Sequence, residues 1–155
     1  PTMAMIEPIV EELRRRGHRD SRRWMISSFS WTTVAATHEF APDIATGCLT
    51  SAEVDEATLE QLAQFGHAAL HPEASQVDEV LVAKCHERGM AVNTWTCNDP
   101  ARLVELARLG VDGVCTDVPA VAMAALGRTG ADEAPTWATV PGSVWTCMPR
   151  ACVPA

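Results

Sequence analysis

Apolar residues recur along the chain in two alternating patterns. Segments with apolar positions three and four residues apart, typical of amphipathic helices, are separated by short apolar runs typical of buried strands. The predicted strands lie at residues 24–29, 44–49, 67–72, 90–96 and 111–116. The predicted helices lie at residues 3–16, 31–41, 51–65, 76–88, 100–109 and 118–126, and each is followed by Gly or Pro. The pattern predicts a strand–helix unit repeated along the chain.

This repetition indicates an α/β protein with parallel strands. Each unit takes roughly 20 to 25 residues, which leaves room for the crossover connection that a parallel neighbour requires. Neither G-x-G-x-x-G nor G-x-x-x-x-G-K-[ST] follows any of the runs, so the nucleotide-binding signatures are missing. A segment of a (β/α) barrel is therefore favoured over a nucleotide-binding open sheet.

The residues that end the predicted strands are the first candidates for function, because parallel α/β proteins place their sites at the carboxyl ends of the strands. These positions hold Ser28-Phe29-Ser30, Leu49-Thr50, His71-Pro72-Glu73, Trp95-Thr96 and Thr116-Asp117. We expect all of them on one rim. Ser30, Asp117 and either Asn98 or Asp99 also suit the N-cap positions of the helices that follow.

Charge and composition narrow the classes of partner that the protein is expected to bind. Twenty acidic against twelve basic residues give a net charge of −8, which argues against nucleic acid because phosphate-backbone binders present basic stripes. No apolar run approaches the roughly 18 residues of a membrane span. The chain has the length of one ordinary globular domain.

The cysteines point to a reducing compartment. None of the six forms a C-x-x-C pair, and four lie in apolar runs or on helical faces, where free cysteine behaves as a small hydrophobe. We expect buried, reduced thiols in a cytoplasmic protein. Cys147 and Cys152 could pair in an oxidising setting. No targeting segment is visible, and secretion stays an alternative because residues upstream of Pro1 could carry one.

Four stretches in order make the sequence resemble a known family. They are SSFS, APDIATGCLT, HPEASQVDEVLVAKCHERGMAVNTWTCND and GVDGVCTDVP. Their order and spacing resemble the C-terminal half of the glycerophosphodiester phosphodiesterase family across about residues 3–127. The resemblance implies the second half of a (β/α)8 TIM-type barrel, strands five to eight, with the amphipathic helices outside. It implies a partial domain at residues 1–128, followed by an irregular Pro- and Gly-containing tail at residues 129–155.

The resemblance also implies an activity and a cofactor. Family members hydrolyse a glycerophosphodiester to an alcohol and glycerol 3-phosphate, a step in lipid and glycerol metabolism, with Mg²⁺ or Ca²⁺. The divalent cation neutralises the phosphate while histidines transfer protons. The family's metal ligands and catalytic histidines lie on its first strands, which have no counterpart in this sequence. We therefore expect no catalytic residue, no metal ligand and no activity in this chain alone.

Phe29, Trp95 and Ser27 are the predicted substrate-binding residues. By the resemblance, Phe29 and Trp95 end the fifth and seventh strands. By strand alternation, Ser27 points the same way as Phe29, and Asn93 the same way as Trp95. The two aromatic rings would form an apolar wall for the glycerol or alcohol part of a small glycerophosphodiester. The alternative is that both rings only fill the barrel mouth.

Other residues offer weaker possibilities for chemistry. His67, His71 and Glu73 could present nitrogen and oxygen ligands on one face of a strand, although two histidines at this spacing are common by chance. The His18-Arg19 pair falls between a helix and the start of a strand, at the stability face of a barrel. Asp117 could be a ligand, but helix capping is favoured.

Two non-catalytic functions remain open. A half-barrel leaves sheet edges that proteins normally close, so the chain could be a remnant that self-associates or pairs with another chain. A small module that binds an anion at the helix starts near Ser30, Asn98 and Asp117 is also physically allowed.

Overall fold

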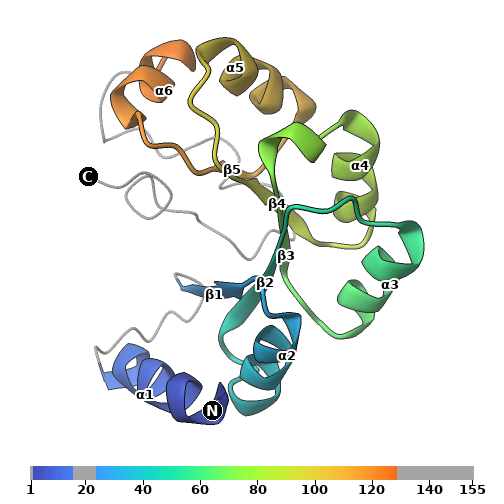
Figure 1. Cartoon of the computed structure of the whole chain (residues 1–155), viewed down its shortest axis with the longest axis vertical. Helices are drawn as coiled ribbons and strands as arrows, with labels where there is room; N and C mark the ends of the chain where they lie inside the picture. The colour runs from blue at the N-terminus through green and yellow to red at the C-terminus, as the bar shows by residue number, and fades with distance from the viewer. Residues whose placement is uncertain (1, 16–23, 129–155) are drawn as a thin grey trace.

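The chain folds into one curved, parallel sheet with helices along its outer side. The computed structural model describes residues 2–15 and 24–128. Five strands pair in chain order, and every pairing between them is parallel. They are β1 (Met25–Ser28), β2 (Ala45–Thr50), β3 (Ala69–Pro72), β4 (Ala91–Thr94) and β5 (Gly113–Val114). Figure 1 shows the strands on the inner side of an arc whose outer side is helical.

Helices connect the strands and cover the outer face of the sheet (Figure 1). They are α1 (Thr2–Arg15), α2 (Trp31–Phe40), α3 (Glu56–Gln64), the short 3₁₀ helix η2 (Ala74–Gln76), α4 (Glu79–Glu87), α5 (Pro100–Leu109) and α6 (Pro119–Ala125). The predicted α/β class and the outward helices are thus confirmed. None of the helices in the described ranges is long and apolar enough to cross a bilayer.

The hydrophobic core lies between the sheet and these helices. Cys48, Leu70 and Val92 occupy equivalent positions on three neighbouring strands and are fully buried against helical residues such as Leu59 and Leu106. A smaller cluster under α1 is formed by Ile6, Val10, Ala41 and Ile44. Cys48, Cys85, Cys97 and Cys115 are free thiols, and burial raises the pKa of Cys48 to about 11. These four cysteines therefore act as small apolar side chains, as their sequence context predicts.

Two of the three predicted helix caps are present. The Ser30 hydroxyl accepts a hydrogen bond from the Thr33 amide at 3.3 Å, and an Asp99 carboxylate oxygen accepts one from the Ala101 amide at 3.1 Å. The prediction that Asp117 caps the last helix is wrong, because Val118 holds the N-cap position and makes no side-chain cap. Asp117 instead accepts a hydrogen bond from the Asn98 side-chain amide at 2.8 Å.

The strand count also differs from the family-based expectation. Strands five to eight would be four strands, whereas the described residues form five, in agreement with the five apolar runs. Four of the five strands are shorter than the predicted runs; for example, β3 begins at Ala69 and β5 has only two residues. The His18-Arg19 pair and the predicted tail at residues 129–155 lie outside the described residues.

Replacing Leu70 with alanine should destabilise the fold strongly. Leu70 is fully buried on β3, so Leu70→Ala removes apolar contacts and leaves a cavity, at a cost of about 2–5 kcal/mol in the free energy of unfolding. Val80→Ala is the control, because Val80 is 58% exposed on α4 and should change stability by less than about 0.5 kcal/mol. Urea denaturation measures both, and equal losses would contradict the described core.

Candidate functional site

The inner face of the sheet carries a row of side chains from neighbouring strands. Parallel pairing matches Leu49 with His71, and Asn93 with Gly113, so each pair points to the same side. His71 Nε2 lies 3.1 Å from Met25 Sδ and 3.2 Å from Asn93 Nδ2. The row therefore joins β1, β3 and β4 across the concave side of the arc.

Two glycines make space for this row. A Cβ atom at Gly47 would lie 2.6 Å from His71 Nε2, and one at Gly113 would lie 2.6 Å from Asn93 Oδ1. Atoms cannot approach that closely without displacing the neighbour. Because both glycines sit on the inner face of their strands, they allow His71 and Asn93 to lie flat against the sheet.

His71 is held as a neutral imidazole. Burial lowers the pKa of His71 from its ordinary value of 6.5 to about 4. Its described polar contacts are a thioether and a side-chain amide, neither of which compensates a positive charge. The floor of the concave face is consequently polar but uncharged at neutral pH.

Phe29 and Trp95 meet above this floor. Their ring centroids are 5.2 Å apart and their planes make an angle of 87°, an edge-to-face arrangement. Phe29 follows β1 and Trp95 follows β4, so the contact spans two intervening strands. Trp95 is fixed further by a 2.7 Å hydrogen bond from its indole Nε1 to the carbonyl oxygen of His71. Phe29 remains 60% exposed although it touches Trp95.

The third predicted substrate-binding residue, Ser27, lies on the same strand face as Phe29. It pairs with Gly47 on β2 and is exposed. The structure thus brings Ser27, Phe29 and Trp95 to one side of the sheet, and the binding role of the three remains a prediction. The alternation of side-chain directions along each strand was enough to predict that Ser27 shares a side with Phe29. The contact between Met25 and His71 could not be predicted in this way, because no local sequence pattern links the two residues.

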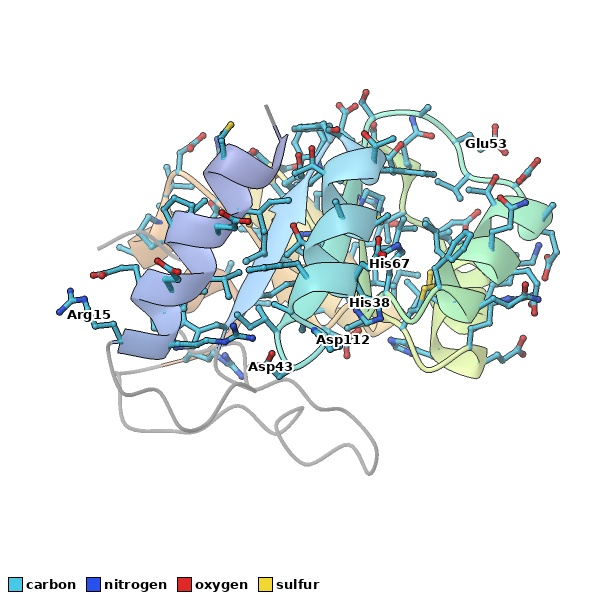
Figure 2. The ribbon with its side chains drawn as sticks, turned by 90° about the horizontal axis from the view of Figure 1, so that it is seen from below. Arg15, His38, Asp43, Glu53, His67 and Asp112 are labelled. Atoms are coloured by element: carbon cyan, nitrogen blue, oxygen red, sulfur yellow. The ribbon has the colours of Figure 1, made fainter. Side chains whose placement is uncertain are left out.

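The possible ligands His67, His71 and Glu73 do not form one cluster. His67 Nδ1 lies 3.0 Å from Thr46 Oγ1, and its ring packs at 5.8 Å from the ring of His38 on the helix side. Figure 2 shows His38 and His67 together, well away from Glu53, which follows the carboxyl end of β2. Strand alternation predicted that His67 and His71 lie on the same side of the sheet. This prediction is wrong because His67 precedes β3, where the chain does not yet have the regular geometry of a strand.

No metal site fits the side chains of the described ranges. No group of three or more His, Cys, Asp or Glu residues there is placed to hold a metal ion. Hard cations such as Mg²⁺ and Ca²⁺ require several oxygen ligands, and the inner row instead offers a thioether, an imidazole and an amide. This donor set does not match the divalent cation that the family resemblance implies.

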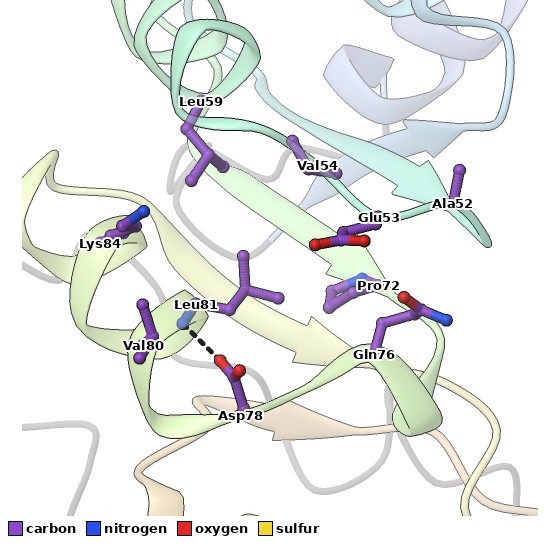
Figure 3. Close-up of a pocket in the computed structure, with 10 residues that line it drawn as sticks. All are labelled: Ala52, Glu53, Val54, Leu59, Pro72, Gln76, Asp78, Val80, Leu81 and Lys84. Carbon is purple, nitrogen blue, oxygen red and sulfur yellow. Dashed lines mark hydrogen bonds between the residues drawn. The ribbon is translucent and has the colours of Figure 1, made fainter.

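A pocket between α3 and α4 lies on the other side of the sheet (Figure 3). Its volume is about 130 Å³, and it is lined by residues of both helices and of the loops before them, including Val54, Leu59 and Leu81. Two of its polar side chains have partners, since Asp78 caps α4 through the Leu81 amide at 2.7 Å and Lys84 pairs with Glu56 at 2.5 Å. Its lining residues come from the helix side of the sheet. The pocket is therefore separate from the concave face.

His71 should titrate at unusually low pH. Because folding lowers its pKa from 6.5 to about 4, the stability that the neutral ring contributes is full above pH 6.5 and is lost as the pH falls towards 4. NMR of the ring protons, assigned with His71→Gln, measures the pKa directly. A His71 pKa at or above 6.5 in the folded chain would contradict the buried, uncharged floor.

Comparisons with known proteins agree on one family. The sequence model of the Glycerophosphoryl diester phosphodiesterase family matches residues 2–121. The chain is 24% identical over 97 residues to YhdW of Bacillus subtilis, named as a candidate glycerophosphodiester phosphodiesterase, and this match covers 61% of the chain and 40% of YhdW. The chain thus spans less than half the length of that relative.

Solved structures show the same likeness. A phosphodiesterase from Oleispira antarctica, in complex with the product sn-glycerol-3-phosphate, is 28% identical with a TM-score of 0.70, over 79% of this chain and 49% of that one. A candidate glycerophosphoryl diester phosphodiesterase from Silicibacter pomeroyi is 29% identical with a TM-score of 0.71, over 79% of this chain and 43% of that one. By sequence and by fold, the chain belongs to the glycerophosphoryl diester phosphodiesterase family.

Proposed function

We propose that this chain forms the C-terminal part of a glycerophosphodiester phosphodiesterase barrel and holds the substrate without carrying out the chemistry. The reaction of the complete domain is hydrolysis of a glycerophosphodiester to an alcohol and glycerol 3-phosphate. We assign the five described strands to strands four to eight of an eight-stranded barrel, one more than the family resemblance implied. The observation that carries the proposal is the Phe29 and Trp95 pair over the concave face of a member of this family.

The chain's own residues would position the organic part of the substrate. Phe29 and Trp95 present apolar surface at the carboxyl ends of their strands, where barrel enzymes bind ligands. The exposed Ser27 hydroxyl lies on the same side and can exchange a hydrogen bond with a substrate hydroxyl. The backbone of β3 supports this layer, because the His71 carbonyl oxygen accepts a hydrogen bond from the Trp95 indole.

The hydrolytic step needs groups that these residues do not supply. Phosphodiester hydrolysis requires charge neutralisation at the phosphate and an acid–base pair, and a divalent cation supplies the first of these in enzymes of this type. The donor set on the concave face suits no such cation, and His71 is too weak a base at neutral pH. The metal ligands and proton-transferring residues would come from the first part of the barrel.

A second candidate function is a non-catalytic domain that self-associates or pairs with another chain. The strands β1 and β5 each have one neighbour among the described strands, so each leaves an edge able to pair. The helices next to these edges expose apolar side chains: Met5 is 67% and Ile9 47% exposed on α1, and Val121 is 44% exposed on α6. This surface favours an additional partner along both edges.

The isolated chain should not hydrolyse glycerophosphocholine. Release of glycerol 3-phosphate is measured with Mg²⁺, with Ca²⁺ and with a chelator. All three rates should equal the uncatalysed rate, because the described residues form no metal site that could neutralise the phosphate. Metal-dependent turnover that persists in His71→Gln would show that other residues of this chain carry out the reaction. It would refute the proposal that the chain only holds the substrate.

The chain should associate at tens of micromolar, because burial of the exposed apolar residues on α1 is favourable. Sedimentation velocity should show a dimer or larger species that Ile9→Lys weakens. Phe65→Lys is the matched control, since Phe65 is 65% exposed after α3, away from both edge strands. A wild-type chain that stays monomeric at tens of micromolar would contradict the predicted association.

A further inference from the structure

The β3–α4 loop, residues 73–78, holds Trp95 through the backbone. The Ala74 amide donates a hydrogen bond of 2.7 Å to the Trp95 carbonyl oxygen, and the Trp95 amide donates one of 3.2 Å to the Pro72 carbonyl oxygen. The indole Nε1 of Trp95 donates a third, of 2.7 Å, to the His71 carbonyl oxygen. The end of β3 and the start of this loop therefore position both the backbone and the ring of Trp95.

Arg102, in the first turn of α5, holds the β3–α4 loop from the next helix along the chain. Its Nη2 atom lies 2.7 Å from the carbonyl oxygens of both Ala74 and Val77 and donates a hydrogen bond to each. The Arg102 side chain is only 24% exposed, and Ala74 and Val77 are buried, so water competes little for these bonds. Because the donor is charged, each bond is stronger than one between neutral groups.

The shape of the arginine side chain suits this contact. A guanidinium group is planar and presents its N–H donors in fixed directions, whereas a lysine ammonium is a single point on a flexible stem. Here Nη2 of Arg102 serves two carbonyl oxygens that lie three residues apart in the loop. Its Nη1 pairs with Glu105 of the same helix at 2.8 Å, which fixes the plane of the group. The loop is thus tied to a regular helix by one rigid fork.

We propose that Arg102 is a positioning residue for the candidate site: it fixes the β3–α4 loop, and through the Ala74 amide it fixes Trp95. This inference rests on the proposed function, in which Trp95 contacts the substrate. Without the guanidinium group, the Ala74 and Val77 carbonyl oxygens lose a donor and the loop becomes less ordered. The bond from the Ala74 amide to the Trp95 carbonyl oxygen then opens more often, and the indole loses its fixed orientation against Phe29. Arg102 acts through the loop and not by contact with the substrate.

Arg102→Met tests this role, because methionine keeps an unbranched apolar stem and removes every donor. Hydrogen exchange of the folded, ¹⁵N-labelled chain is followed by NMR at the Ala74 amide and at the Trp95 indole. Both should exchange at least about tenfold faster in the variant, because hydrogen bonds from charged donors contribute more than neutral ones. The Val92 amide, which donates to the Asp112 carboxylate at 2.8 Å, reports global unfolding and should change less. Equal acceleration at all three sites would show a purely structural role and overturn the inference.

Three further variants assign the effect to the two carbonyl bonds. Arg102→Lys keeps the charge and a donor, and should recover part of the protection of the Ala74 amide. Glu105→Gln removes the ion pair but keeps both carbonyl bonds, so exchange at Ala74 should stay at the wild-type rate. Arg108→Met removes the same charge from an exposed position of α5 and should also leave it unchanged. Acceleration by either control as strong as that by Arg102→Met would overturn the inference.

A titration with glycerol 3-phosphate separates this inference from the proposed function. The Trp95 indole signal of the wild-type chain should shift saturably, and Arg102→Met should weaken the binding several-fold. The indole signal of Trp31, which donates to the Leu49 carbonyl oxygen at 2.9 Å, is the internal control.

Two outcomes distinguish the failures. Faster exchange at Ala74 and Trp95 in Arg102→Met, with no response of the wild-type chain to glycerol 3-phosphate, would support the positioning of Trp95 but refute the substrate-holding role. Wild-type exchange rates in Arg102→Met, together with equal binding of glycerol 3-phosphate by both chains, would overturn the inference and leave the proposed function in place.

Discussion

The parallel register of the five strands is the constraint on which the rest of the structure depends. In a parallel sheet, paired residues point to the same side, so one register decides which side chains meet the helices and which meet the concave face. Here Cys48, Leu70 and Val92 fall on the helix side and are fully buried. The alternate positions, including His71 and Asn93, fall on the inner side. A shift of one residue in any pairing would exchange these two sets.

The two faces of the sheet therefore have different physical character. The outer face is apolar and packed, and its burial stabilises the fold. The inner face carries a thioether, a neutral imidazole and an amide in contact, with two glycines that keep the space for them. Such a face can support the aromatic pair at the rim, and the three side chains in contact on it carry no charge at neutral pH.

The sequence predicted the elements well because each is a local pattern. The helical period and the following Gly or Pro located the helices, and the caps at Ser30 and Asp99 were recognisable from their residue types. The failures involved tertiary contacts. Asp117 bonds to Asn98, which belongs to a different loop, and His67 turns to the helix side before its strand begins. Neither outcome depends on residues close in sequence.

The candidate site was predictable only in part for the same reason. Strand alternation predicted on which side of its strand each of Phe29 and Trp95 lies. It could not predict that the two rings touch. That contact depends on the curvature of the sheet, which brings the ends of β1 and β4 together across two other strands. The lowered pKa of His71 likewise depends on burial by several elements and has no local signal.

The contact between Phe29 and Trp95 tests this account most directly, because it exists only if the register, the curvature and the side-chain directions are all correct. The measurement is a nuclear Overhauser experiment between the Phe29 ring protons and the Trp95 indole protons in the folded chain. The account predicts clear cross-peaks, since the ring centroids are 5.2 Å apart. A well-dispersed spectrum with both rings assigned and no such cross-peaks would contradict it.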